Sequence, residues 1–135
     1  MAFFEWTDEL SVNVGAIDAQ HKQLVEMINS LNEAMLRKKG REMQKATIDA
    51  MVDYAATHFK LEEGYMKKFQ YPDFEKHKSE HDKFTRTALD LKERAEQKSF
   101  GLTLEIMGFL RTWLLDHIMG TDKKYSAFFN AHGLH

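Results

Sequence analysis

Apolar side chains recur at steps of three and four residues along four stretches of the chain, and histidines stand among them. The first two stretches comprise Ile17, His21, Leu24, Ile28, Leu31 and Met35, and then Thr47, Met51, Tyr54, His58, Leu61 and Tyr65. The third comprises Phe74, His77, His81, Phe84, Ala88, Leu91 and Ala95, and the fourth Ile106, Leu110, Trp113 and His117, with Leu114 and Ile118 beside them. Such spacing is typical of a helix with one apolar face. The pattern therefore predicts four amphipathic helices.

Glycine and proline residues divide these stretches. Gly40, in RKKGRE, stands where the C-terminus of a helix favours a left-handed residue. Pro72, in QYPDFE, suits the first position of the third helix. Ser99 and Gly101 separate the third helix from the fourth, and Gly120 loosens or ends the fourth. Because short connections favour antiparallel neighbours, we predict an all-α fold, an up-down-up-down antiparallel four-helix bundle.

The two ends of the chain follow different patterns. Leu10, Val12 and Val14 alternate with polar residues, which predicts an extended N-terminal arm lying against the bundle. A short C-terminal helical tail is expected after Asp122. The chain is 135 residues long, which suits one domain. Within that single domain the predicted parts are the arm (1–16), the bundle (17–119) and the tail (120–135).

Composition excludes several classes of protein. There is no cysteine, so disulfides and thiolate metal sites are impossible. The formal net charge of -2 gives no basic surplus for nucleic acid. The N-terminus MAFFEWTDEL lacks the features of a secretory signal, and no apolar run reaches the ~20 residues of a membrane span. We expect a self-standing cytoplasmic domain with no membrane span.

Five histidines occupy the inward face of their predicted helices: His21, His58, His77, His81 and His117. A single buried histidine is more often a hydrogen-bonded core residue than a ligand. Five neutral imidazoles in one core would each need a donor and an acceptor, and the sequence offers few. A metal would satisfy one nitrogen of every ring. The set as a whole therefore predicts a metal centre.

Two of these histidines have a second candidate ligand one helical turn away. His58 and Glu62 project the same way, as do His77 and His81, because residues four apart share a helix face. A carboxylate one turn from a histidine can bridge two metals. Glu63 lies about 100° further round the helix, and we expect it to be solvated.

Asp122 is a weaker candidate. It follows His117 by five residues, which on a regular helix places it about 140° away. Gly120, between the two, could let the chain unwind and bring Asp122 inward. Taken alone, Asp122 would be read as a surface aspartate near a helix end.

The ligand types narrow the metal. Nitrogen and oxygen ligands without sulfur suit iron, manganese, copper or zinc. Five imidazoles and two carboxylates are too many for one ion and suit two ions that share bridges. The chain has no Glu-x-x-His motif of the ferritin-like carboxylate proteins; the nearest is Asp18 three residues before His21. Fewer anionic ligands stabilise oxidised metals less, which favours reversible dioxygen binding.

In their order and spacing these motifs resemble the hemerythrin family, and bacteriohemerythrins in particular. The resemblance rests on His21, HFKLE (58–62), HKSEH (77–81) and HIMGTD (117–122), and extends from WTDELSVNVGAIDAQHKQL through DKKY. It implies two iron ions in a non-haem di-iron centre. One iron would be held by His77, His81 and His117. The other would be held by His21 and His58, with an open position for dioxygen. Glu62 and Asp122 would bridge the irons, together with an oxo or hydroxo group.

The resemblance also implies an apolar oxygen pocket. Leu114 would guard the bound dioxygen, and Trp113, Ile118 and Phe59 would line the same space. Ordinary core packing is the alternative for Trp113 and Phe59. Tyr125 matches a recurrent tyrosine of the family and would act behind the ligands. We expect the tail residues His132 and His135 to be solvated.

Four functions are compatible with such a site. The first is a non-enzymatic, monomeric dioxygen carrier, store or supplier, with an oxygen-consuming enzyme as a recipient. The second is an oxygen or redox sensor. The third is a di-iron peroxidase or a nitric-oxide-handling enzyme, for which the sequence offers no acid–base residue beside the open iron. Iron storage is the fourth, and it lacks a carboxylate-lined surface.

Overall fold

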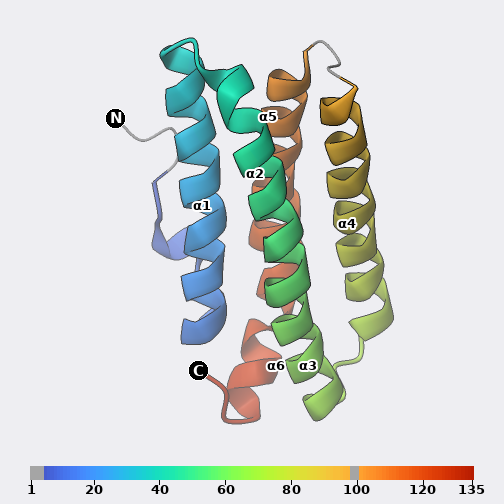
Figure 1. Ribbon diagram of the computed structural model, residues 1–135. Coiled ribbons are helices and arrows are strands. Elements are labelled where there is room, and N and C mark those ends of the chain that lie inside the picture. The colour runs from blue at the N-terminus through green and yellow to red at the C-terminus, as the bar shows by residue number, and fades with distance from the viewer. Residues whose placement is uncertain (1–4, 98–100) are drawn as a thin grey trace.

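A computed structural model gives the structure of residues 5–97 and 101–135. The chain forms four long helical rods that run alternately up and down (Figure 1). The first two rods are α1 (Gly15–Leu36) and the continuous series α2 (Gly40–Tyr54), η2 (Ala55–Phe59) and α3 (Lys60–Phe69). The third and fourth are α4 (Phe74–Glu96) and α5 (Leu102–Thr112) with η3 (Trp113–Thr121). The predicted antiparallel four-helix bundle is confirmed.

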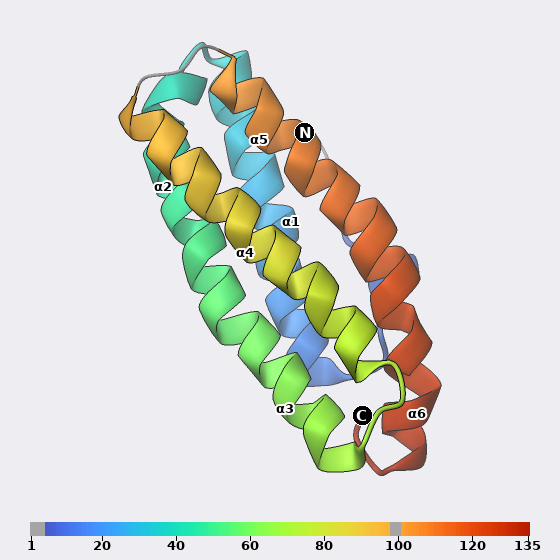
Figure 2. The same cartoon turned by 90° about the vertical axis from the view of Figure 1, so that its right-hand side faces the viewer.

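The rods pack as neighbours in a closed ring. Contacts join α1 to α2, α2 to α4, α4 to α5 and α5 back to α1. Figure 2 shows the bundle from the side of α4, with α6 beside α3 at the lower end. After η4 (Asp122–Tyr125), the short α6 (Ser126–Ala131) closes the lower end, as the predicted helical tail. In the part of the chain that is described, no helix is long and apolar enough to cross a membrane.

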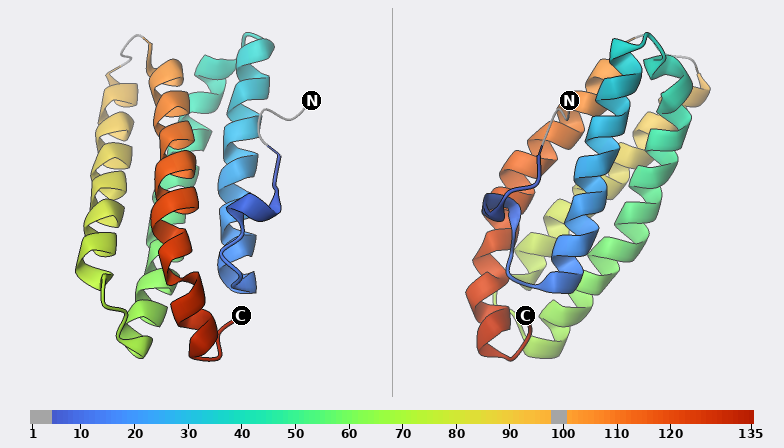
Figure 3. Two further views of the ribbon diagram at one scale, coloured as in Figure 1. Left: turned by 180° about the vertical axis from the view of Figure 1, so that it is seen from behind. Right: turned by 90° about the vertical axis from the view of Figure 1, so that its left-hand side faces the viewer.

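The N-terminal arm lies along the outside of the bundle (Figure 3). Its alternating residues Leu10, Val12 and Val14 are buried, as predicted, although one short 3-10 turn, η1 (Asp8–Leu10), interrupts the extended chain. The carboxylate of Asp18 fastens the arm: it accepts hydrogen bonds from the Ser11 hydroxyl at 2.6 Å and the Val12 amide at 2.8 Å. Asp18, which stands three residues before His21, therefore binds the N-terminal arm and does not act as a metal ligand in the manner of a Glu-x-x-His motif.

Two turns differ from the sequence-based prediction. Gly40 does not end the first helix in a left-handed conformation; Lys38 does so, with φ of 58°. Gly40 instead begins α2 as a buried residue. Pro72 precedes α4 by two residues, so it lies in the turn and not at the first helical position. The left-handed residue that ends α3 is Gln70, with φ of 58°. Gly101 is left-handed as well, while Ser99 lies outside the described residues.

Gly40 is required by close packing. A Cβ atom there would meet Thr103 Cγ2 at 2.9 Å and Met35 Cγ at 3.0 Å. We expect Gly40→Ala to destabilise the protein by about 1–3 kcal/mol, the usual cost of overpacking. Gly64→Ala is the control, because a Cβ atom there would meet nothing within 4 Å beyond its own helix backbone, and α3 should gain about 0.5–1 kcal/mol. Urea unfolding measures both. Equal stability of the two variants would contradict the packing role of Gly40.

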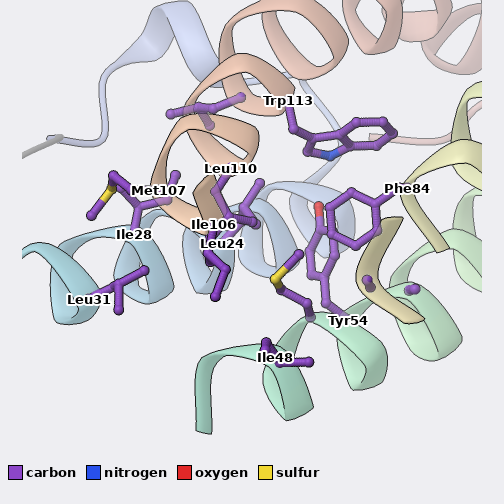
Figure 4. Close-up of a cluster of buried hydrophobic side chains, with 14 of the residues drawn as sticks. Leu24, Ile28, Leu31, Ile48, Tyr54, Phe84, Ile106, Met107, Leu110 and Trp113 are labelled. Carbon is purple, nitrogen blue, oxygen red and sulfur yellow. The ribbon is translucent and has the colours of Figure 1, made fainter. Parts of the chain in front are cut away.

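The predicted apolar faces form the interior. Side chains from all four rods meet in a large hydrophobic cluster, which includes Leu24, Ile48, Phe84 and Leu110 (Figure 4). A second, smaller cluster lies at the end closed by α6. In the second rod the buried face shifts by one residue after His58. There Glu62 and Met66 are buried, while Leu61 and Tyr65, which the periodicity placed inward, are only half-buried.

Candidate metal centre

All seven predicted ligands meet in the interior between the two hydrophobic clusters. None of their side chains is more than 3 % exposed. Each rod contributes: His21 on α1, His58 on η2, Glu62 on α3, His77 and His81 on α4, His117 on η3 and Asp122 at the start of η4.

The ligand atoms form two overlapping groups, each with its members within 4.8 Å of one another. The first group contains Glu62, His77, His81, His117 and Asp122, and the second His21, His58, Glu62 and Asp122. The two carboxylates belong to both groups. The arrangement can therefore hold two ions, three imidazoles facing one and two facing the other.

Asp122 faces both groups through different oxygens. Its Oδ1 lies 2.8 Å from His77 Nε2 and 2.9 Å from His117 Nε2. Its Oδ2 lies 3.0 Å from His21 Nε2. A carboxylate with one oxygen toward each group is placed to bridge two ions.

Glu62 faces both groups mainly through one oxygen. Its Oε1 lies 3.1 Å from His81 Nε2 and 3.4 Å from His58 Nε2. Its Oε2 accepts a hydrogen bond from the Tyr125 hydroxyl. Tyr125 thus fixes the rotation of this carboxylate and leaves Oε1 directed at the centre.

A local change of helix type brings Asp122 onto the face of His117. From Trp113 to Thr121 the fourth rod is a π-helix, and the Asp122 amide donates to the carbonyl of His117, five residues earlier. A turn closed over five residues aligns positions 117 and 122, which a regular helix would not. Asp122 therefore lies inward, as predicted, although through a π-helical segment and not through a break at Gly120. The helix widens without breaking, and Gly120 lies within it.

The polar atoms of the centre test whether a metal fits. Nε2 of His77, His81 and His117 and both oxygens of Asp122 are buried, and no hydrogen-bond partner exists for them among the described residues. Asp122 Oδ1 lies 2.8 Å from His77 Nε2 and 2.9 Å from His117 Nε2, but these contacts lack the directions of hydrogen bonds. Buried polar atoms without partners are costly, by about 1–3 kcal/mol each. Ions between these atoms would satisfy them, so the donor set fits a pair of metals.

Three of the imidazoles are oriented through their outer nitrogens. His58 Nδ1 lies 2.6 Å from Gln20 Oε1, His81 Nδ1 2.9 Å from Glu63 Oε2, and His117 Nδ1 3.1 Å from Glu80 Oε1. Such partners fix ring orientation and tautomer, which leaves Nε2 free to bind a metal.

The sequence-based interpretation missed these partners. Glu63 was expected to be solvated, but its side chain is only 19 % exposed and it contacts a ring on the neighbouring rod. Glu80 and Gln20 were not considered. The available signal was their position directly beside a histidine on the same rod, Glu80 before His81 and Gln20 before His21. That signal is weak, because each partner serves a histidine of another rod.

Aromatic rings enclose the imidazoles. Phe59 stacks on His81 with ring centroids 3.9 Å apart, and Trp113 stacks on His117 at 3.9 Å. Tyr54 stacks on His58 at 4.6 Å, and Tyr125 lies over His77 at 5.6 Å. Phe59 and Trp113 thus do more than fill the core.

Leu114 and Ile118 belong to the same hydrophobic cluster as Phe59 and Trp113, and both are fully buried. The tail residues His132 and His135 are exposed, and neither belongs to a group of candidate ligands.

Charge is balanced inside the metal-free centre by protons. Burial disfavours the imidazolium form of His21, but the carboxylates of Asp122 and Glu62 outweigh burial and raise its pKa to about 9. The same causes raise the pKa of His77 to about 10. Despite burial, the neighbouring histidines hold the pKa of both carboxyl groups well below its ordinary value. Burial lowers the pKa of His58. To bind, metal ions would have to displace the protons of the histidines whose pKa is raised.

A sequence model of the hemerythrin HHE cation-binding domain matches residues 12–129. The chain belongs to the hemerythrin family. At the level of the family it is a di-iron, oxygen-binding protein. The HHE cation-binding domain is thus matched over the stretch that contains all seven candidate ligands.

Individual relatives agree with this assignment. The chain is 37 % identical over 132 residues to the bacteriohemerythrin of Methylococcus capsulatus, covering 97 % of this chain and 100 % of the relative. It is 34 % identical over 136 residues to the bacteriohemerythrin of Stenotrophomonas maltophilia, covering 98 % and 85 %. The crystal structure of a wild-type hemerythrin superposes with a TM-score of 0.83 at 36 % identity, over 93 % of this chain and 97 % of that chain.

Proposed function

We propose that this protein binds dioxygen reversibly at two iron ions, and that it acts as a carrier, store or supplier without catalysing a reaction. The observation that carries the proposal is the sharing of two carboxylates between groups with unequal numbers of imidazoles. Unequal groups leave one ion with fewer protein ligands and hence a position for a small molecule. The proposed unit is one domain, 1–135, acting as a cytoplasmic monomer that delivers dioxygen to an oxygen-consuming enzyme.

In this proposal His77, His81 and His117 would hold one ion, and His21 and His58 would hold the other. Glu62 and Asp122 would be shared between the two. Two iron ions would supply a redox-active pair to which dioxygen binds and from which it is released.

The protein's own part is to position the imidazoles and exclude water. The rings of Phe59, Trp113 and Tyr54 cover the imidazoles, and Leu114 and Ile118 fill the space beside them. A dry site keeps protons and water from a bound oxidant, which is the condition for releasing dioxygen unchanged.

The test is repeated exposure of the anaerobically reduced, iron-loaded protein to air, followed by visible absorption and metal analysis. We expect close to two irons per chain and an absorption band that appears with air and disappears on deoxygenation over many cycles. Consumption of oxidant without recovery of the starting spectrum would indicate an enzyme. A protein that takes up one ion, or zinc alone, would contradict the proposal.

Leu114 offers a prediction about water exclusion. We expect Leu114→Ala to speed the irreversible oxidation of the oxygenated protein about tenfold, because the cavity left by a buried leucine admits water to the pocket. Leu31→Ala is the control: it truncates an equally buried leucine of the same hydrophobic cluster, near the far end of α1 from the ligand His21. The decay of the visible band measures both. Equal rates in Leu114→Ala and the wild type would remove Leu114 from this role.

A further inference from the structure

Glu80 connects two positions of the fourth rod that lie one turn apart. It stands on α4, and its Oε1 lies 3.1 Å from His117 Nδ1. The Thr121 hydroxyl donates to the same carboxylate, at 3.0 Å to Oε1 and 3.2 Å to Oε2. One carboxylate thus holds both His117 and Thr121, the residue that immediately precedes Asp122. These three residues are called the Glu80 clamp below.

The clamp spans the turn on which the metal centre depends. Within this turn the Asp122 amide donates to the His117 carbonyl over five residues. π-helical turns are rare because the regular helix is more stable, so such a segment needs contacts that favour it. The carboxylate of Glu80 contacts His117, where the widened turn begins, and Thr121, the residue before its end at Asp122.

The geometry points to a specific role: Glu80 is a positioning residue that anchors the segment from His117 to Thr121 to α4 and thereby holds the adjacent Asp122 among the metal ligands. His117 and Thr121 would share a face on a regular helix too, so the clamp acts by holding the existing π-helical segment against α4. Without this anchor the segment is freer to relax, and in a regular helix Asp122 would lie about 140° from the face of His117. Because Asp122 faces both groups of ligands, such a rotation would affect both ions.

Glu63 provides a matched comparison. It also accepts from the outer nitrogen of a candidate ligand, His81, at 2.9 Å. However, His81 lies on the regular helix α4, so the contact of Glu63 joins α3 to α4 and does not anchor η3. Removing Glu63 therefore disturbs one imidazole of the three-histidine group, while removing Glu80 disturbs an imidazole and the shared Asp122.

The first test uses the metal-free protein and amide hydrogen exchange. We expect Glu80→Gln to speed exchange in residues 113–122 about tenfold, the effect of losing one hydrogen bond to a charged group. Thr121→Val removes only the hydroxyl and should speed exchange in the same segment by a smaller factor. Glu63→Gln should leave the segment unchanged. Unchanged exchange in both Glu80→Gln and Thr121→Val would overturn the inference.

The second test is titration with Co²⁺, followed by its visible absorption. Loss of a residue behind a ligand weakens metal binding about 10–100-fold. Glu63→Gln should weaken one of two binding steps, and Glu80→Gln both. If Glu80→Gln weakened one step only and Thr121→Val none, Glu80 would merely orient His117 and the inference would be wrong.

This inference rests on the proposed metal centre only for the titration. If wild-type protein bound no Co²⁺, the proposed function would fail, whereas exchange in the metal-free protein would still decide whether Glu80 anchors this segment. The mild Thr121→Val variant keeps the test valid should Glu80→Gln fold poorly.

Discussion

Asp122→Asn is expected to reduce the iron content from close to two ions per chain to one or fewer. The amide keeps the shape of the side chain but removes the charge that faces His21, His77 and His117. Each ion held by this group would lose an anionic ligand. Metal affinity should therefore fall by more than the roughly 10–100-fold that follows when only the outer partner of a ligand is removed. Metal analysis after dialysis against weak chelator measures the change.

Asp116→Asn is the matched control. Asp116 lies in the same π-helical segment but is exposed and belongs to no group of candidate ligands. Its replacement should leave iron content at the wild-type value. Full iron content in Asp122→Asn would show that Asp122 is not a shared ligand and would refute the assignment of the second carboxylate.

Removal of the metals should produce the second large effect, a loss of thermal stability that reverses on reloading. An ion present at about 1,000 times its dissociation constant stabilises the folded state by about 4 kcal/mol. For a chain of this length that corresponds to a fall in Tm on the order of 10–20 °C. The physical cause is the set of buried Nε2 and carboxylate atoms that lack hydrogen-bond partners. Calorimetry before chelation, after it and after reloading measures the effect.

The size of this effect should depend on pH. The pKa values of His21 and His77 are raised to about 9 and about 10 in the metal-free fold. Their contribution to its stability is full below the unfolded value of about 6.5 and is lost as the pH rises through the folded values. The carboxyl groups, with lowered pKa, contribute above about pH 4 and lose that contribution as the pH falls. His58, with a lowered pKa, acts in the direction opposite to His21.

Reloading should therefore release protons and raise Tm more at alkaline pH. At pH 7.5 uptake of two ions should release at least two protons, those of His21 and His77, because the carboxylates beside His117 raise its pKa as well. Titration calorimetry in two buffers of different ionisation enthalpy counts them. A Tm that does not fall on chelation, or uptake without proton release, would mean that no ion occupies the space among these ligands.

The sequence alone determined the bundle and the candidate ligands. A four-helix fold follows from periodicity that each segment carries by itself, as in the buried faces of α1 and α4. His58 with Glu62, and His77 with His81, are paired by a spacing of four residues, which is local geometry. Five histidines on inward faces then leave a metal centre as the economical explanation for so many polar groups in one core.

Only the tertiary structure decided how that centre is held. On a regular helix Asp122 would not share a face with His117. The π-helical turn that brings the two together has no recognisable signal in the local sequence, and Gly120 is only one residue within it. Gln20, Glu63 and Glu80 reach histidines on other rods, so their roles depend on the angle and relative height of the packed helices. Periodicity describes one helix at a time. Contacts between helices, which orient the ligands, are fixed when the core packs.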